Sequence, residues 1–108
     1  MVEAFSTGDL SHVDELLSPD YLDHQGIGRG EIQGIDGFRE VVRTARRGYK
    51  ELGVEIDDLI AEGDQVVARL RWHGTPIDPA KSTALRHTIE IVRFVDGRAV
   101  EHWGTRIL

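Results

Sequence analysis

The stretch that decides the fold runs from Thr88 to Gly104 and reads TIEIVRFVDGRAVEHWG. Two segments rich in β-branched and aromatic residues flank the pair Asp96-Gly97. An Asp-Gly pair favours the positive φ angles of a tight primed turn, which joins two antiparallel strands. The sequence therefore predicts a β-hairpin that spans this stretch.

Alternation along the two predicted strands divides their side chains between two faces, because successive strand residues point in opposite directions. One face of the first strand carries Thr88, Glu90, Val92 and Phe94, and the other carries His87, Ile89, Ile91 and Arg93. Both sets contain apolar residues, so both faces of the sheet are expected to be covered. In the second strand Val100, His102 and Gly104 alternate with Glu101 and Trp103, so His102 and Trp103 cannot face the same pocket.

The residues before this hairpin predict helices first and strands afterwards. An apolar stripe that includes Phe38 predicts an amphipathic helix over 35–47. Shorter helices are predicted at 2–5, as the last turn of a helix cut short, and from residue 9 or 11 to 17. A short strand over 21–25 leads into a glycine-rich loop, and longer strands are predicted over 54–61, 65–73, 85–95 and 99–107. This order is typical of an α+β fold with helices packed on one face of a curved antiparallel sheet. We expect a single domain over residues 1–108.

Composition excludes several classes of function. The 13 basic and 19 acidic residues give a net charge of −6, which repels nucleic acid and anionic lipid. No cysteine is available for a disulfide or a thiolate, and no apolar run approaches the roughly 20 residues of a membrane helix. The five histidines include no i,i+4 pair on a predicted helix, and no nucleotide fingerprint is present. We expect a cytoplasmic protein that uses neither a metal nor a cofactor.

Several segments resemble the SnoaL-like polyketide cyclases of the nuclear transport factor 2-like superfamily, which also contains ketosteroid isomerases and limonene epoxide hydrolases. They are IEIVRF and EHWG of the hairpin, Gly8-Asp9-Leu10, residues 19–24 (PDYLDH) and residues 59–64 (LIAEGD). The resemblance covers nearly the whole chain. It implies a cone-shaped fold whose open end binds a small apolar molecule, and family members commonly form homodimers through the sheet. Apolar residues on the outer face, such as Ile89, Ile91 and Trp103, are consistent with such a dimer.

The resemblance also singles out candidate catalytic residues. Glu90 lies where ketosteroid isomerases carry an inward-facing acid that donates a hydrogen bond to the developing oxyanion. The alternative is a structural ion pair of Glu90 with Arg69 or Arg71. His102 either forms a proton relay with Glu90 or is a buried histidine held by a backbone carbonyl. Asp23 and His24 point to opposite faces, so only one of them can enter the cavity, and the alternative is that the pair caps the end of a strand.

Other residues are expected to bind the substrate or mark departures from the family. We expect Trp72, Leu70, Phe38 and Gln25 to line the substrate site, and Gln25 falls closest to the isomerase base without being able to act as one. The base aspartate of the cyclases lies just after the EHW tryptophan, at a position that is Gly104 here. The neighbouring histidine of the cyclases corresponds to Glu90.

The sequence thus predicts cofactor-free acid–base chemistry on an apolar ketone or polyketide-like substrate, by cyclisation, isomerisation or dehydration. The alternatives are a non-catalytic ligand-binding or dimerisation domain and an activity like that of limonene epoxide hydrolase. A basic ridge of Arg39, Arg43 and Arg46 on the predicted long helix is either a solvated surface or an anion site.

Overall fold

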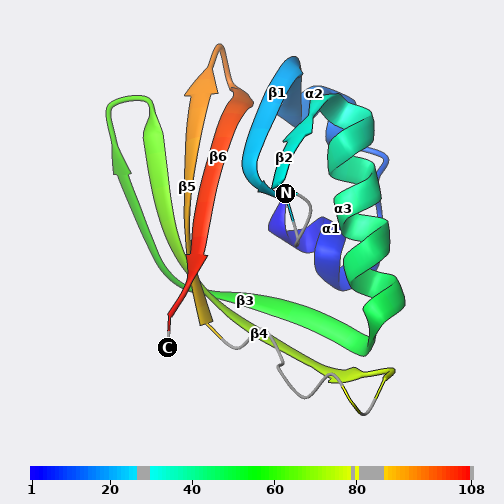
Figure 1. Cartoon of the computed structure of the whole chain (residues 1–108). Coiled ribbons are helices and arrows are strands. Elements are labelled where there is room, and N and C mark those ends of the chain that lie inside the picture. Colours follow the sequence, from blue (N-terminus) through cyan, green and yellow to red (C-terminus); the bar gives the residue numbers. More distant parts are fainter. Residues whose placement is uncertain (27–29, 79, 81–86, 108) are drawn as a thin grey trace.

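A computed structural model describes residues 1–26, 30–78, 80 and 87–107. Figure 1 shows small helices and a curved sheet. The helices are α1 (Val2–Thr7), α2 (Val13–Leu16) and α3 (Gly34–Gly48), and the strands are β1 (Leu17–Gly26), β2 (Gly30–Gln33), β3 (Tyr49–Glu62), β4 (Gln65–Pro76), β5 (His87–Val95) and β6 (Arg98–Arg106). None of the helices in the described part of the chain is long and apolar enough to cross a membrane.

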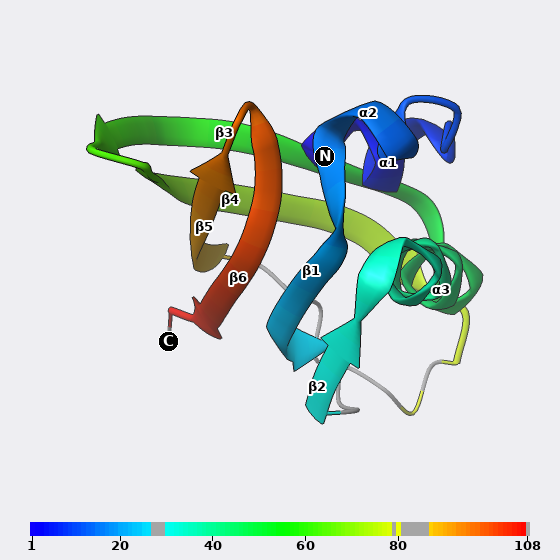
Figure 2. The same cartoon turned by 90° about the horizontal axis from the view of Figure 1, so that it is seen from above.

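The six strands form one sheet in the order β2-β1-β6-β5-β4-β3. All neighbours are antiparallel except β1 and β6, which run parallel. Figure 2 shows that the sheet curves and remains open, and α3 contacts both of its edge strands, β2 and β3, as well as β1. The α+β class and the helix-filled, curved sheet predicted from the sequence are therefore confirmed.

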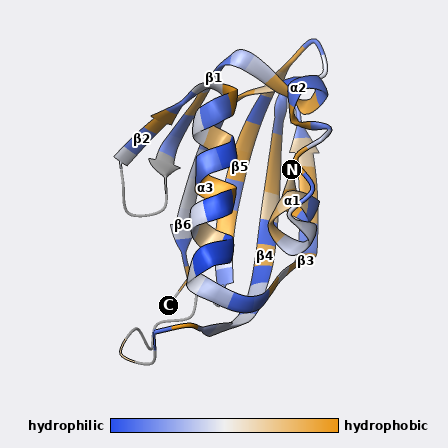
Figure 3. Ribbon diagram, turned by 90° about the vertical axis from the view of Figure 1, so that its right-hand side faces the viewer, coloured by the Kyte–Doolittle hydropathy of each residue, from blue (hydrophilic) through white to orange (hydrophobic). Residues whose placement is uncertain are grey.

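The predicted hairpin forms around Asp96 and Gly97, whose φ angles of 51° and 78° are those of a primed turn. Its inner face, defined as the face toward α3, carries Thr88, Glu90, Val92 and Phe94. Val92 and Phe94 pack against the core, as alternation requires. Figure 3 shows α3 in front of this sheet, with its apolar residues interleaved among hydrophilic ones.

One irregularity breaks the predicted alternation in β6. The register shifts after the pair Arg93–Glu101, so that Phe94 pairs with Ala99. Ala99, rather than Val100, is consequently the fully buried residue at this end of the strand. The shift leaves His102 opposite Val92, on the inner face.

The main core lies between α3 and the strands β1 and β6. Its buried members are Ala4, Val13, Leu17, Tyr21, Phe38, Val42 and Ala99. Phe38 contacts both Phe5 and Tyr21 edge-on, with ring centroids 6.0 Å apart in each pair. These contacts anchor α1 and β1 to the long helix.

Several boundaries differ from the prediction. The second helix is a single turn, because Ser11 bonds Asp9 in a local turn instead of capping a helix at residue 11. β1 begins at once, at Leu17, and β2 was not predicted. Of the predicted elements, residues 27–29 of the glycine-rich loop and 85–86 of the third long strand lie outside the described residues.

Arg43 of the basic ridge is exposed, as expected of a solvated surface, whereas the other two arginines have structural contacts. Arg39 pairs with Asp14 and Asp36, so it links α3 to α2. Arg46 donates hydrogen bonds to the carbonyl oxygens of Phe5 and Ser6 at the end of α1. These pairings leave neither arginine as the solvated side chain or anion ligand that the sequence suggested.

Candidate active site

Three of the four predicted catalytic side chains meet on the inner face of the sheet. Asp23 in β1 and His102 in β6 are directly paired across the parallel strands. Glu90 in β5 pairs with Gly104, two residues beyond His102, and so lies diagonally across from His102 on the same face. We call Asp23, His102 and Glu90 the acid–base trio.

His102 lies between the two carboxylates of the trio. Its Nδ1 is 2.7 Å from Oδ1 of Asp23, and its Nε2 is 2.7 Å from Oε1 of Glu90. Both distances fit charge-assisted hydrogen bonds donated by a doubly protonated ring. Side-chain exposure rises from 6% at Asp23 through 14% at His102 to 17% at Glu90. Glu90 is thus the end of the trio that is most open to a substrate.

The carboxylates keep His102 protonated at neutral pH. Burial, the largest single influence, lowers the pKa of His102, but hydrogen bonds to Asp23 and Glu90 and their negative charges together raise it to about 9. With both carboxylates ionised, the trio carries a net charge of −1. A buried, hydrogen-bonded group of titratable residues with a perturbed pKa is typical of functional sites.

Two of the structural alternatives for this group are wrong. Glu90 bonds His102 rather than an arginine, since Arg69 pairs with Asp58 and Arg71 pairs with Glu55 and Asp57. Carboxylates, rather than a backbone carbonyl, hold His102. The geometry therefore matches the predicted pairing of histidine and glutamate and adds Asp23 to it.

His24 lies on the opposite, outer face. Its ring nitrogens are 3.0 Å from Glu31 and 2.8 Å from Glu101, and its ring stacks on Trp103. The hydrogen bond to Glu101 is the largest influence on the pKa of His24 and raises it. Desolvation, the next largest, lowers the pKa, but the bond to Glu31 and the charges of both glutamates add to the rise. Of the neighbouring pair, Asp23 is the residue that enters the interior.

The predicted substrate-binding residues have different surroundings. Leu70 pairs with Thr88 on the inner face, and Trp72 donates a hydrogen bond from Nε1 to Oγ1 of Thr88 at 2.9 Å. Phe38 is 3% exposed and belongs to the core. Gln25 lies in β1, but its side chain is outside the described part. The roles of all four residues in substrate binding stay predictions.

Tyr21 is a residue of this region that was not predicted. It lies two residues before Asp23 in β1, and both side chains are almost fully buried, whereas those of Leu22 and His24 are only partly buried. Burial, then the negative charges of Asp23 and Glu90, raise the pKa of the Tyr21 hydroxyl. The alternation of Tyr21, Leu22 and Asp23 is the signal that places the tyrosine beside the trio.

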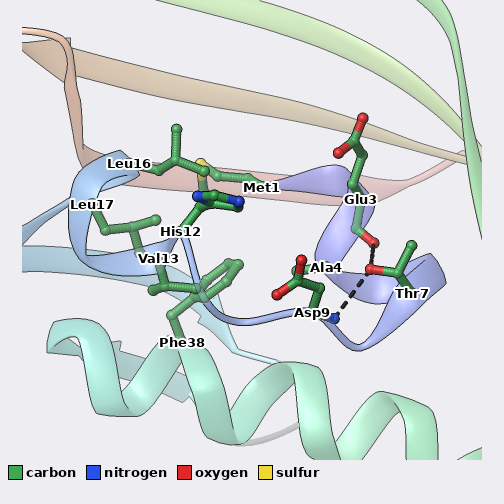
Figure 4. Close-up of a pocket in the computed structure, with 10 residues that line it drawn as sticks. All are labelled: Met1, Glu3, Ala4, Thr7, Asp9, His12, Val13, Leu16, Leu17 and Phe38. Carbon is green, nitrogen blue, oxygen red and sulfur yellow. Dashed lines mark hydrogen bonds between the residues drawn. The ribbon is translucent and has the colours of Figure 1, made fainter.

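Figure 4 shows a separate hollow between α1, α2 and α3. Val13, Leu17 and Phe38 contribute apolar walls, and Glu3, Asp9 and His12 are polar lining residues. The acid–base trio does not line this hollow, which is therefore distinct from the candidate active site. Among the described residues, no group of three or more His, Asp or Glu side chains is arranged to hold a metal ion.

Comparisons with known proteins show which family and fold this chain is similar to. A family model described as a SnoaL-like domain matches residues 1–102. Nogalonic acid methyl ester cyclase from Streptomyces nogalater is 28% identical over 109 residues, which cover 94% of this chain and 81% of the cyclase.

Solved structures show the same fold. TsrD from Streptomyces laurentii has a TM-score of 0.78 and 29% identity, covering 96% of this chain and 80% of TsrD. Wild-type IdmH from Streptomyces antibioticus, a candidate polyketide cyclase, has a TM-score of 0.80 and 26% identity, covering 96% of this chain and 84% of IdmH. The chain therefore has the cone-shaped, nuclear transport factor 2-like fold.

Proposed function

The chain belongs to the SnoaL-like domain family, and from this we propose that it is an enzyme that closes a ring in a polyketide-like ketone by cofactor-free acid–base chemistry. The observation that carries the proposal is the acid–base trio, in which an imidazolium joins two carboxylates on the inner face. The similarity to a cyclase over 94% of the chain supports ring closure as the reaction type.

Glu90 is the proposed base. It is the most exposed member of the trio. Its Oε1 accepts the hydrogen bond from His102, and Oε2 has no hydrogen bond to a described residue. Oε2 is then the oxygen that accepts a proton. Asp23 and His102 are positioning residues in this scheme, because Asp23 fixes the ring of His102 and His102 fixes the carboxylate of Glu90.

The proposed reaction begins when the Glu90 carboxylate takes a proton from the carbon next to a substrate carbonyl. The electron pair of the broken C–H bond forms an enolate, whose carbon attacks a second carbonyl carbon of the same molecule. The resulting alkoxide takes the proton back from Glu90 and becomes a hydroxyl group. The net charge of site and substrate stays at −1 throughout, which avoids creating an additional buried charge. Isomerisation and dehydration of a ketone begin with the same proton transfer.

Gly104 supports the assignment of Glu90. The resemblance to cyclases places their base aspartate at this position, where glycine has no side chain. Glu90 is the direct cross-strand partner of Gly104. The neighbouring strand therefore supplies a carboxylate beside the position where the family carries one.

The test is proton transfer by Glu90→Gln. The probes are nogalonic acid methyl ester, followed to its cyclised product by chromatography, and 2-tetralone, followed by deuterium exchange next to its carbonyl. We expect the variant to lose about 100- to 10,000-fold in rate with both probes, because it lacks the base. We expect the variant to fold, because a glutamine amide oxygen still accepts a hydrogen bond from His102. Circular dichroism checks this.

Glu101→Gln is the matched control. Glu101 is also partly buried and also bonds a histidine, but it lies on the outer face. Its variant should keep the wild-type rate. Equal rates for wild type and Glu90→Gln would remove Glu90 as the base. Binding of 2-tetralone by the wild-type protein with no turnover of either probe would instead favour a non-catalytic binding domain.

A further inference from the structure

The Tyr21 hydroxyl is a polar group that makes no hydrogen bond within the described part of the chain. Tyr21 is 1% exposed, and the structure gives its hydroxyl no hydrogen bond to any described residue. Fully buried side-chain nitrogen and oxygen atoms of the described residues all have partners. The unpaired hydroxyl oxygen must therefore belong to the small part of the side chain that is still accessible.

The ring that carries this hydroxyl is held firmly. Phe38 contacts it edge-on at 6.0 Å, and Leu17 and Ala99 belong to the same fully buried cluster. A hydroxyl on a packed ring has a fixed position, which is what a catalytic donor needs. Asp23 lies two residues after Tyr21 in β1, on the same inner face. Asp23 bonds His102, which in turn bonds Glu90.

We propose that the Tyr21 hydroxyl donates the hydrogen bond that holds the carbonyl oxygen of the substrate while Glu90 removes the neighbouring proton. The inference rests on the function proposed above and makes Tyr21 a catalytic residue of the same site. As the C–H bond breaks, negative charge moves from Glu90 to the carbonyl oxygen, where the hydroxyl stabilises it. Burial and the carboxylates beside it keep the hydroxyl protonated, so it remains a donor at neutral pH.

The charge of the surroundings also selects the class of substrate. The trio carries a net charge of −1, so an oxygen that is already anionic in the free ligand is repelled. A neutral ketone or ester carbonyl becomes negative only when Glu90 has been neutralised by the proton. The site is thus suited to neutral carbonyl compounds and disfavours a free carboxylate at this position.

The experiment compares Tyr21→Phe with Tyr49→Phe, since the chain has these two tyrosines only. The probes are 2-naphthol, a neutral mimic of the enol, and 2-naphthoic acid, its anionic counterpart. Tyrosine labelled with ¹³C at Cζ reports hydroxyl contacts, and the Tyr49→Phe protein shows the Tyr21 signal alone. Deuterium exchange of 2-tetralone supplies kcat and KM.

We expect 2-naphthol to shift the Tyr21 signal and to bind about 10-fold more weakly to Tyr21→Phe. The kcat for exchange should fall about 100-fold with little change in KM, while Tyr49→Phe keeps the wild-type values. 2-Naphthoic acid should bind more weakly than 2-naphthol. The melting temperature of Tyr21→Phe should match the wild type, because the phenyl ring and its packing remain.

Unchanged naphthol binding and kcat in Tyr21→Phe would overturn the proposal, and so would a large fall in melting temperature that accompanies the loss of rate. If Glu90→Gln abolishes exchange while Tyr21→Phe does not, the inference about Tyr21 fails and the proposed function stands. If the wild-type protein does not exchange the proton of 2-tetralone, the proposed function fails. Separately, a Tyr21 NMR signal that does not shift when 2-naphthol is added would show that the hydroxyl does not contact this ligand.

Discussion

The charge of His102 depends on the folded state. Its pKa is about 9 in the fold against 6.5 in an ordinary environment, with opposing contributions from burial and from the bonds to Asp23 and Glu90. Below pH 6.5 the folded and unfolded chains both carry the proton, so the stabilisation by the trio is complete. Between pH 6.5 and 9 the unfolded chain releases the proton while the folded chain keeps it, so stability falls with rising pH.

We therefore predict that the free energy of unfolding decreases by up to about 3 kcal/mol from pH 6.5 to 9. Urea unfolding followed by circular dichroism across this range measures it. His24→Gln serves as the background, because the raised pKa of this more exposed residue adds a smaller effect of the same sign. His102→Gln in that background should flatten the profile. An equally steep profile after this change would contradict the assignment.

The candidates Glu90, His102 and Asp23 follow from the sequence, but their contact does not. Alternation indicates that Asp23 and His24 point to opposite faces, but it does not determine which of the two faces is the inner one. The pairing of β1 with β6 decides it, and that pairing joins residues 79 positions apart. Tyr21 was missed for the same reason, since its packing partners include Phe38 of α3 and Ala99 of β6.

At the scale of elements, strand register fixes the space around Glu90. The inner-face row Leu59, Ala68, Glu90 and Gly104 runs straight across β3, β4, β5 and β6. Glu90 thus has the two smallest side chains in this row, Ala68 and Gly104, as its direct neighbours. If the proposed function is right, we expect a substrate ring to lie over these two small side chains, beside the carboxylate.

We predict that Ala68→Leu, which puts a larger side chain in this place, lowers kcat/KM for 2-tetralone exchange at least about 10-fold, roughly the effect of 1.4 kcal/mol in transition-state binding. Val67→Leu is the matched control, because Val67 is the next residue and points to the outer face. Both variants should unfold at similar urea concentrations. An unaffected rate in Ala68→Leu would place the substrate elsewhere on the sheet.

Helices and strands with a strong hydrophobic periodicity in their own residues were predictable from the sequence. Strands that form because they pair with residues distant in the sequence were not. The hairpin, α3 and β4 carry their periodicity in their own residues. β2 has four residues, of which only Ile32 is strongly apolar, and it is a strand because it pairs with Leu22 and Asp23 of β1. The early start of β1 depends on the pairing of Leu17 with Ala99, and the shift in β6 depends on the packing of Ala99.

At the scale of the whole molecule, the outer face carries an apolar row that is in register across four strands. It consists of Ile60, Val67, Ile91 and Trp103. Ile60 is 63% exposed, and nearby Ile89 is also exposed. We expect two copies of the chain to pair through this row, because exposed apolar residues in a continuous patch favour association.

Sedimentation velocity tests this expectation. Trp103→Glu should convert dimers to monomers by placing a charge in the row. Leu59→Glu is the control, since Leu59 is as exposed as Ile60 at 62% but lies on the inner face. A wild-type protein that sediments as a monomer, or a Trp103→Glu variant that sediments as a dimer, would exclude this interface.

The parallel pairing of β1 with β6 has a consequence for how the chain acquires its chemistry. Asp23 and His102 lie near opposite ends of the sequence, so their contact closes a loop that contains most of the chain. Closing a long loop is entropically unfavourable, and contacts of high sequence separation slow folding. During synthesis the carboxylates of Asp23 and Glu90 emerge from the ribosome before their histidine does. A partly made or partly folded chain therefore lacks the geometry of the acid–base trio, which forms only when β1 and β6 have paired.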